Sequence, residues 1–164
     1  MAHSKCRSLI KLFLAVSIGA FMAHSVVAQS KVTSMPTDIP RSYFAVSDGT
    51  PATYGETLKL SRKSASFSKL KGKMKLQYSD VWNNGKDTEF GGDVYKVLNA
   101  DEFFSLNKST QRFCDQPVKW VTIKDTSALL GDGTVRIGML TVDDWHKYSP
   151  TSLGACSADT YKLK

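Results

Sequence analysis

The sequence predicts a mainly β protein of the β-rich α+β type, an antiparallel curled sheet or a small barrel with one or two short helices and one disulfide. About seven short β-prone segments are separated by turn signals such as Asp-Gly and Asn-Gly, which is typical of antiparallel sheets. Residues 70–78, LKGKMKLQY, alternate apolar and polar side chains, as in a strand with one buried face. Cys114 and Cys156 are the only cysteines after residue 28, and an isolated pair in an exported chain usually forms a disulfide.

Residues 1–28 have the features of a cleavable secretory signal peptide. A basic start is followed by the apolar run 12–23 and by Val26, Val27 and Ala28, whose side chains suit the sites before the cut. The run is shorter than the roughly 18–20 residues of a membrane helix, so we expect cleavage rather than an uncleaved anchor. These features are typical of a bacterial protein that is periplasmic or secreted and has no transmembrane segment after cleavage.

The mature chain has room for one domain and carries a mildly basic charge. Removing 28 of the 164 residues leaves 136, and the net charge falls from +7 to +4 because three basic residues are lost. Residues 29–42 are polar with two prolines, and we expect a flexible leader there. Residues 43–164 are expected to form a single β-rich domain. The charge favours anionic partners and does not by itself indicate nucleic acid.

The predicted elements follow one another with short connections. Strands are expected at 42–46, 56–63, 70–78, 93–98, 118–125, 134–142 and 159–164. An Asn-Gly pair within 82–87 indicates a hairpin turn, and 99–107 is expected to be a short helix capped by Asn99. Apolar residues on both faces of 134–142 indicate a central strand, whereas 159–164 is expected at a sheet edge. If these strands are right, the buried residues include Leu76, Trp120, Val135, Ile137 and Met139.

The stretch TVDDWHKY, residues 141–148, holds the one histidine that follows the signal peptide. Because His146 stands alone and the cysteines are paired, a zinc site of several histidines or thiolates is excluded within one chain, and we expect no metal or other cofactor. No G-x-S-x-G motif presents a serine nucleophile. In a helical turn Asp143 and His146 could meet, which leaves a small secreted hydrolase as the alternative function. The simpler interpretation is that Asp143 caps a one-turn helix and Trp145 folds back onto the core.

Lysines recur at every second position around the start of the strand predicted at 70–78: Lys69, Lys71, Lys73 and Lys75. Lys59, Arg62 and Lys63 extend this basic stretch, and no acidic residue lies between 59 and 77. Four ammonium groups on one side of a strand repel one another unless something anionic neutralises them. Candidates are lipopolysaccharide phosphates, phospholipid headgroups, a cell-wall polymer or an acidic protein. Alternatively, the lysines face solvent on an edge strand, where they suppress edge-to-edge pairing.

Trp82 precedes the predicted hairpin turn and is followed by two asparagines. An exposed tryptophan there could stack on a sugar ring or anchor a protein partner, or it could pack beneath its own turn. Together, the lysines and Trp82 favour a non-enzymatic exported binding protein that acts on an envelope component or a protein partner, of the inhibitor, immunity or stress type. We expect no nucleic-acid partner, because aromatic residues do not interleave with the basic face.

Overall fold

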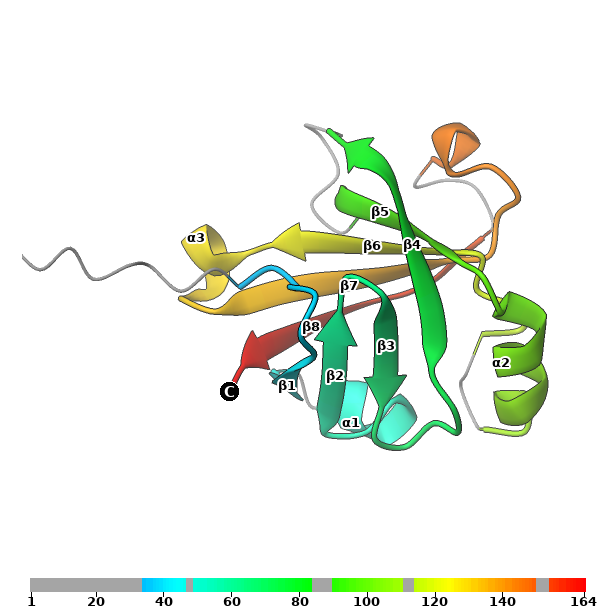
Figure 1. Ribbon diagram of the computed structural model, residues 1–164, viewed down its shortest axis with the longest axis horizontal. Coiled ribbons are helices and arrows are strands. Elements are labelled where there is room, and N and C mark those ends of the chain that lie inside the picture. The colour runs from blue at the N-terminus through cyan, green and yellow to red at the C-terminus, as the bar shows by residue number, and fades with distance from the viewer. Residues whose placement is uncertain (1–33, 47–48, 84–89, 111–113, 150–153) are drawn as a thin grey trace, which may run out of the picture. The chain divides into compact units, whose positions relative to one another are not determined.

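The chain forms a barrel in a computed structural model that describes residues 34–46, 49–83, 90–110, 114–149 and 154–164 (Figure 1). All of these residues belong to one compact unit, 32–164. Each of eight strands pairs antiparallel with the next in sequence, and the last returns to pair with the first. The predicted mainly β, antiparallel class is therefore confirmed, in its barrel form. The strands are β1 Arg41–Ala45, β2 Thr57–Ser61, β3 Ser64–Phe67, β4 Met74–Trp82, β5 Gly92–Val97, β6 Trp120–Asp125, β7 Thr134–Leu140 and β8 Ala155–Leu163.

Short helical segments occupy four of the connections. They are α1 Gly49–Thr53, α2 Ala100–Asn107, α3 Ser127–Leu130 and the 3₁₀ turn η1 Trp145–Lys147. The helix predicted at 99–107 corresponds to α2. Asn99 is the N-cap residue of α2, as predicted, although its side chain makes no capping hydrogen bond to the helix. No helix in the described ranges is long and apolar enough to cross a membrane.

Two strand predictions differ from the structure. β3 was not predicted, because its four residues, SASF, offer only Ala65 and Phe67 to the core. The edge position predicted for 159–164 is wrong, because these residues lie in β8, which pairs with β7 on one side and with β1 on the other. Closure of the barrel joins the first strand to the last, so a strand at the chain end becomes an interior one.

The main core fills the barrel, and a second apolar cluster lies outside it. Along β4, Met74 and Leu76 are buried while Lys75 and Gln77 are exposed, as the alternation predicts. Of the predicted core residues, Leu76, Val135, Ile137 and Met139 are buried, and β7 is buried on both faces as expected of a central strand. Trp120 is only half-buried, because it points outward from β6. It packs against the outer cluster formed by Phe90, Val94, Leu140, Trp145 and Tyr148.

β4 extends well past the end of β3. β3 pairs only with the first two residues of β4, whereas β5 pairs with β4 along its whole length. Residues 77–82 of β4 therefore have no neighbouring strand on the β3 side within the described part of the chain. The register with β5 shifts at Ser79, and the carboxylate of Asp80 accepts a hydrogen bond from the Val81 N–H at 2.7 Å.

The described part of the predicted leader packs against the barrel. Ser34 and Pro36 are buried, and the Tyr43 hydroxyl donates to the Ser34 carbonyl at 2.8 Å. The Arg62 N–H donates to the Thr37 carbonyl at 2.9 Å, so the same segment also contacts the turn between β2 and β3.

Candidate functional site

The predicted row of lysines is not a single strand face. Lys69, Lys71 and Lys73 precede β4, and only Lys75 lies within it, so the predicted strand 70–78 begins too early. The alternation breaks at Gly72, whose φ of 75° lies in the left-handed region that favours glycine. The prediction failed because glycine was counted as an inward-facing strand position, whereas its backbone turns the chain there.

Two asparagine side chains from the ends of α2 hold this lysine segment in place. The Asn107 amide accepts from the Lys71 N–H at 2.8 Å and donates to the Lys71 carbonyl at 3.0 Å. In the same manner, Asn99 accepts from the Lys75 N–H at 2.8 Å and donates to the Lys73 carbonyl at 3.1 Å. Each amide thus replaces the peptide group of a missing neighbouring strand. Sequence reasoning treated Asn99 only as a helix cap and did not consider Asn107.

The four lysines of the segment have different surroundings. The Lys69 ammonium donates to the Ala52 carbonyl at the end of α1, which ties this side chain to the protein. Lys71, Lys73 and Lys75 are exposed. Three of the four therefore remain available to solvent, although they do not form one row.

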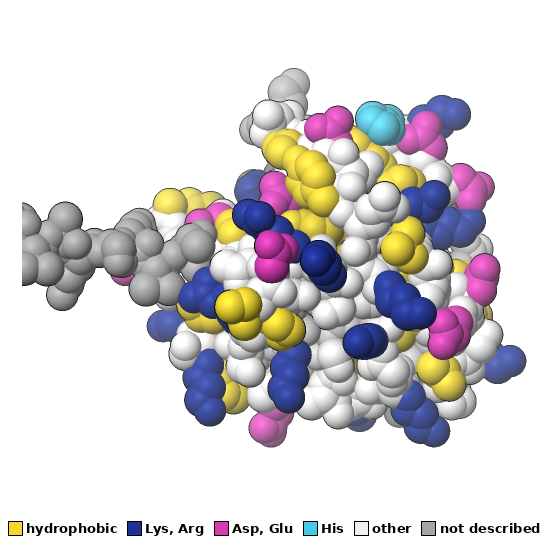
Figure 2. Space-filling view, viewed as in Figure 1, with side chains coloured by type: hydrophobic (Ala, Val, Ile, Leu, Met, Phe, Trp, Pro, Cys, Tyr) yellow, Lys and Arg dark blue, Asp and Glu magenta, His cyan; other side chains and the backbone are white. Residues whose placement is uncertain are grey.

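Outward-pointing lysines instead follow the barrel wall from strand to strand. The alternation of each strand directs Lys59 of β2, Lys75 of β4, Lys96 of β5 and Lys162 of β8 away from the core, and all four are exposed. We call these four residues the basic belt. Figure 2 shows dark blue Lys and Arg side chains spread over the face of the wall that carries β2, β3 and β4.

The strand registers place the belt around the barrel. Lys59 faces Ser66 on β3, and Ser64, two residues away, faces Lys75 on β4. Lys96 of β5 pairs with the β4 residue that lies two positions after Lys75. At ordinary strand spacings, the Cα atoms of Lys59 and Lys75 lie about 12 Å apart and those of Lys75 and Lys96 about 8 Å apart. Because barrel strands are tilted, by about 35–45° in most barrels, this diagonal path runs around the barrel.

Acidic side chains are scarce on the outside of the wall. Among the described strand residues, Asp80 is the acid at an outward position and Asp125 is exposed at the end of β6, whereas Asp93 and Asp159 share the inward face with Tyr95 and Tyr161. Within the described ranges, no ion pair involves a belt lysine. Within the described part of the chain, the belt lysines therefore have no acidic partners.

Trp82 lies apart from the belt and is only half-exposed. Its ring centroid is 5.7 Å from that of Trp145 and 5.6 Å from that of Tyr148, so it packs against the outer cluster. The turn predicted within 82–87 lies largely outside the described residues, although β4 and β5 pair as a hairpin would. Packing with distant aromatic residues was not among the two interpretations that the sequence suggested.

The stretch 141–148 covers the outer face of the sheet. Trp145 is 5% exposed within the outer cluster, as the predicted fold-back onto a core requires. The capping residue of η1 is Asp144, so the predicted cap at Asp143 is wrong by one residue. Asp144 accepts from the His146 N–H at 3.0 Å and lies 2.8 Å from the ring Nδ1 of His146. The imidazole stacks on Trp145, with ring centroids 3.8 Å apart.

Asp143 and His146 do not form a pair. Asp143 contacts the ammonium of Lys119, whose hydrogen bond holds the pKa of Asp143 below its ordinary value. Hydrogen bonds from His146 likewise lower the pKa of Asp144. A lowered pKa makes both carboxyl groups weak bases, so they are poorly suited to act as general bases near neutral pH. Within the described ranges, no group of three His, Cys, Asp or Glu residues could hold a metal ion.

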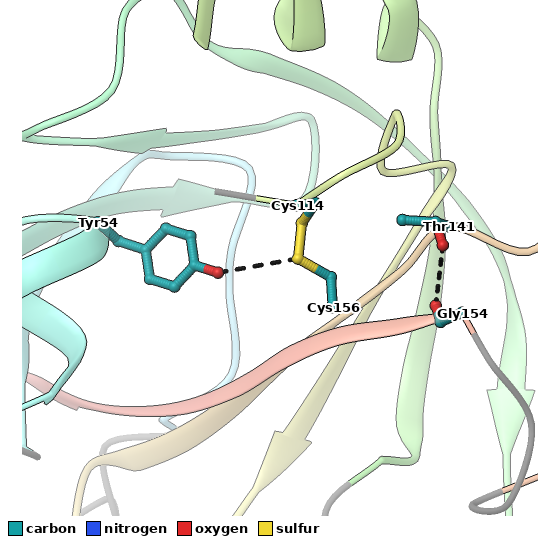
Figure 3. The surroundings of a disulfide bond; sticks show 5 residues. All are labelled: Tyr54, Cys114, Thr141, Gly154 and Cys156. Carbon is teal, nitrogen blue, oxygen red and sulfur yellow. Dashed lines mark hydrogen bonds between the residues drawn. A yellow bond between two sulfur atoms is a disulfide. The ribbon is translucent and has the colours of Figure 1, made fainter. Parts of the chain in front are cut away.

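The predicted disulfide between Cys114 and Cys156 is confirmed, with Cα atoms 5.4 Å apart. It ties the segment before β6 to the start of β8 and borders a surface depression of about 810 Å³. Figure 3 shows the Tyr54 ring directed at the disulfide, with its hydroxyl 3.9 Å from the Cys156 sulfur. The lining residues are Cys114, Asp115, Gln116, Lys119, Thr141, Val142, Asp143, Gly154, Ala155 and Cys156.

No protein-family model, curated protein or solved structure matches the chain.

Proposed function

We propose that the protein is an exported, non-enzymatic binding protein of a bacterial envelope, periplasmic or secreted, and that its basic belt binds an anionic envelope component. The observation that supports this proposal is the charge of the wall: the described strands carry four exposed outward lysines, one outward acid, Asp80, and one exposed acid at a strand end, Asp125. The signal-like residues 1–28 and the disulfide are compatible with export.

The residues of the belt suit a polymer with repeated negative charges. A lysine ammonium is a compact point charge that binds phosphate without demanding one geometry. Ser64 and Ser66 lie on the strand between Lys59 and Lys75, and their hydroxyl groups offer further hydrogen-bond donors. These features favour affinity through summed charge rather than through a single specific pocket.

The curvature of the belt favours a flexible chain over a flat surface. Lys59, Lys75 and Lys96 occupy β2, β4 and β5, so they point in successively different directions around the barrel. A planar membrane meets two or three of the belt lysines at once, whereas a linear polyanion follows the wall. We therefore favour an anionic cell-wall polymer over phospholipid headgroups.

A charge-matched comparison tests the proposal. The triple variant Lys59→Gln, Lys75→Gln, Lys96→Gln removes three belt charges, and Lys108→Gln, Lys124→Gln, Lys147→Gln removes the same charge from other places. Binding to fluorescent inorganic polyphosphate is measured against salt concentration. The belt variant should bind at least tenfold more weakly and lose about two units of salt slope, given about 0.7–0.9 per contact. Equal losses in the two variants would refute a localised site.

The alternative of a hydrolase that uses Asp143 and His146 gains no support from the geometry. Asp144, not Asp143, contacts the imidazole, and Lys119 holds Asp143. Turnover of an esterase or peptidase substrate that disappears in His146→Ala would revive this alternative.

A further inference from the structure

The disulfide borders an open depression of the folded protein, although Cys114 belongs to the main core and Cys156 packs against it. Cys114 is 7% exposed and Cys156 is half-buried, and both line the open depression beside β6, β7 and β8. Thiol–disulfide exchange requires that the attacking thiolate reaches one sulfur. The other sulfur must lie where it can leave as a thiolate. A disulfide in the sealed core of the barrel would require unfolding before it could react.

The two sides of Cys156 differ chemically. On the inner side the Tyr54 hydroxyl donates to its sulfur, because a disulfide sulfur carries no hydrogen to donate. On the outer side the depression carries Asp115, Asp143 and Lys119. Lys119 pairs with Asp143, and among the described residues that line the depression the carboxylate of Asp115 has no cationic partner.

From this arrangement we propose that Cys114–Cys156 is a thiol-exchange site for a dithiol partner whose reactive thiol has neutral or cationic surroundings. The incoming thiolate attacks the Cys156 sulfur, the disulfide breaks, and Cys114 leaves as a thiolate that takes a proton from water. The second thiol of the partner, once deprotonated, attacks the mixed disulfide and releases Cys156 as a thiolate, toward which the Tyr54 hydroxyl is directed. Two electrons pass to the protein, and the dithiol becomes a disulfide.

The barrel does not need the disulfide for its closure. β8 pairs with both β7 and β1 through backbone hydrogen bonds along the strand, and the inward residues Tyr161 and Ile137 remain in the core. The reduced protein is therefore expected to stay folded, with its far-ultraviolet circular dichroism unchanged. This property distinguishes an exchange site from a disulfide that only holds the fold together.

The test measures how fast the folded protein reacts with thiols of different charge. Cysteamine, 2-mercaptoethanol and mercaptoacetate are added at equal thiolate concentrations, the reaction is stopped with acid, and alkylated thiols are counted by mass spectrometry. The rate should rise linearly with thiol concentration. Each rate is divided by the rate of the same thiol with uncharged 2-hydroxyethyl disulfide, because thiolates of different pKa differ in intrinsic nucleophilicity. After this normalisation cysteamine should react about fivefold faster than mercaptoacetate, as expected for one carboxylate acting on a change of two charge units. A rate that becomes independent of thiol concentration would show that unfolding limits the reaction, and would overturn the proposal.

Two variants separate the charge effect from general reactivity. Asp115→Asn should bring the ratio of cysteamine to mercaptoacetate rates close to one, whereas Asp101→Asn, which changes an exposed acid on α2, should leave it unchanged. If Asp115→Asn and Asp101→Asn behave alike, the depression does not select its thiol and the proposed partner is wrong. Loss of the circular dichroism signal on reduction would equally contradict an exchange site.

Discussion

Asn107 is the residue whose replacement tests most directly how the lysine segment is held. Its side chain is 1% exposed and makes three hydrogen bonds, two to Lys71 and one to the Phe103 carbonyl at 2.8 Å. A typical hydrogen bond contributes about 0.5–1.5 kcal/mol net, so Asn107→Ala should lower the free energy of unfolding by about 2–4 kcal/mol. For a domain of this size, the Tm should fall by roughly 6–15 °C.

Urea denaturation followed by tryptophan fluorescence measures this loss of stability. A second variant, Asn107→Asp, distinguishes the hydrogen bond that the side chain accepts from the two that it donates. The introduced carboxylate still accepts from the Lys71 N–H but faces the Lys71 and Phe103 carbonyls where the amide donated. This repulsion raises the folded-state pKa of the new carboxyl group. Its protonated form is therefore favoured by folding, and the variant should lose stability as pH rises from about 4 to 7. Asn107 would not hold the lysine segment as described if Asn107→Ala lowered the free energy of unfolding by less than about 0.5 kcal/mol. The same conclusion would follow if the stability difference between Asn107→Asp and the wild type did not depend on pH.

Three further predictions concern separate parts of the fold. Tyr161→Phe should leave the free energy of unfolding unchanged or raise it by up to about 1 kcal/mol, since the buried hydroxyl has no hydrogen-bond partner in the described residues. Tyr43→Phe should lower it by about 1 kcal/mol, because the hydrogen bond to the Ser34 carbonyl is lost. A urea titration that gives the reverse order of stability would contradict this prediction. Gly92→Ala should prevent folded protein from accumulating in the expression host. The Gly92 φ is 81°, and the added Cβ would lie 2.8 Å from the Lys124 Cα. A yield equal to that of the wild type would show that the site tolerates alanine. Asp144→Asn should reduce the fall in stability below about pH 5. Its lowered pKa gives a contribution that is present above the unfolded value, about 3.9, and is lost as pH falls through the folded value; an acid titration identical to that of the wild type would contradict this.

Local patterns were sufficient for most strands and for the disulfide. Alternation gave the inward residues of β4 and β7, and only two cysteines follow residue 28, so they offer a single intramolecular pairing. Closure of the barrel could not be predicted in the same way, since β1 and β8 meet only after the whole chain has curled. The short β3 was missed because serine and alanine give little periodic signal.

The candidate site was harder to predict than the fold. Lys59, Lys75 and Lys96 are far apart in sequence, and only the registers of β2 to β5 bring them onto one path. The sequence showed the dense stretch 69–75, whose spacing of two suggested a single strand face. A positive φ at Gly72 and the amides of α2 give that stretch a different shape. Neither effect is encoded in the spacing of the lysines.

Residues 77–82 of β4, which have no neighbouring strand on the β3 side among the described residues, bear on the behaviour of the protein at high concentration. An unpaired strand side offers a template on which a second chain can add its own strand, the first step of many aggregates. The irregularity at Ser79 interrupts the regular spacing that such growth requires, and Asp80 occupies the Val81 N–H while adding a negative charge. We therefore expect Ser79 and Asp80 to oppose the addition of a second chain at this side of β4.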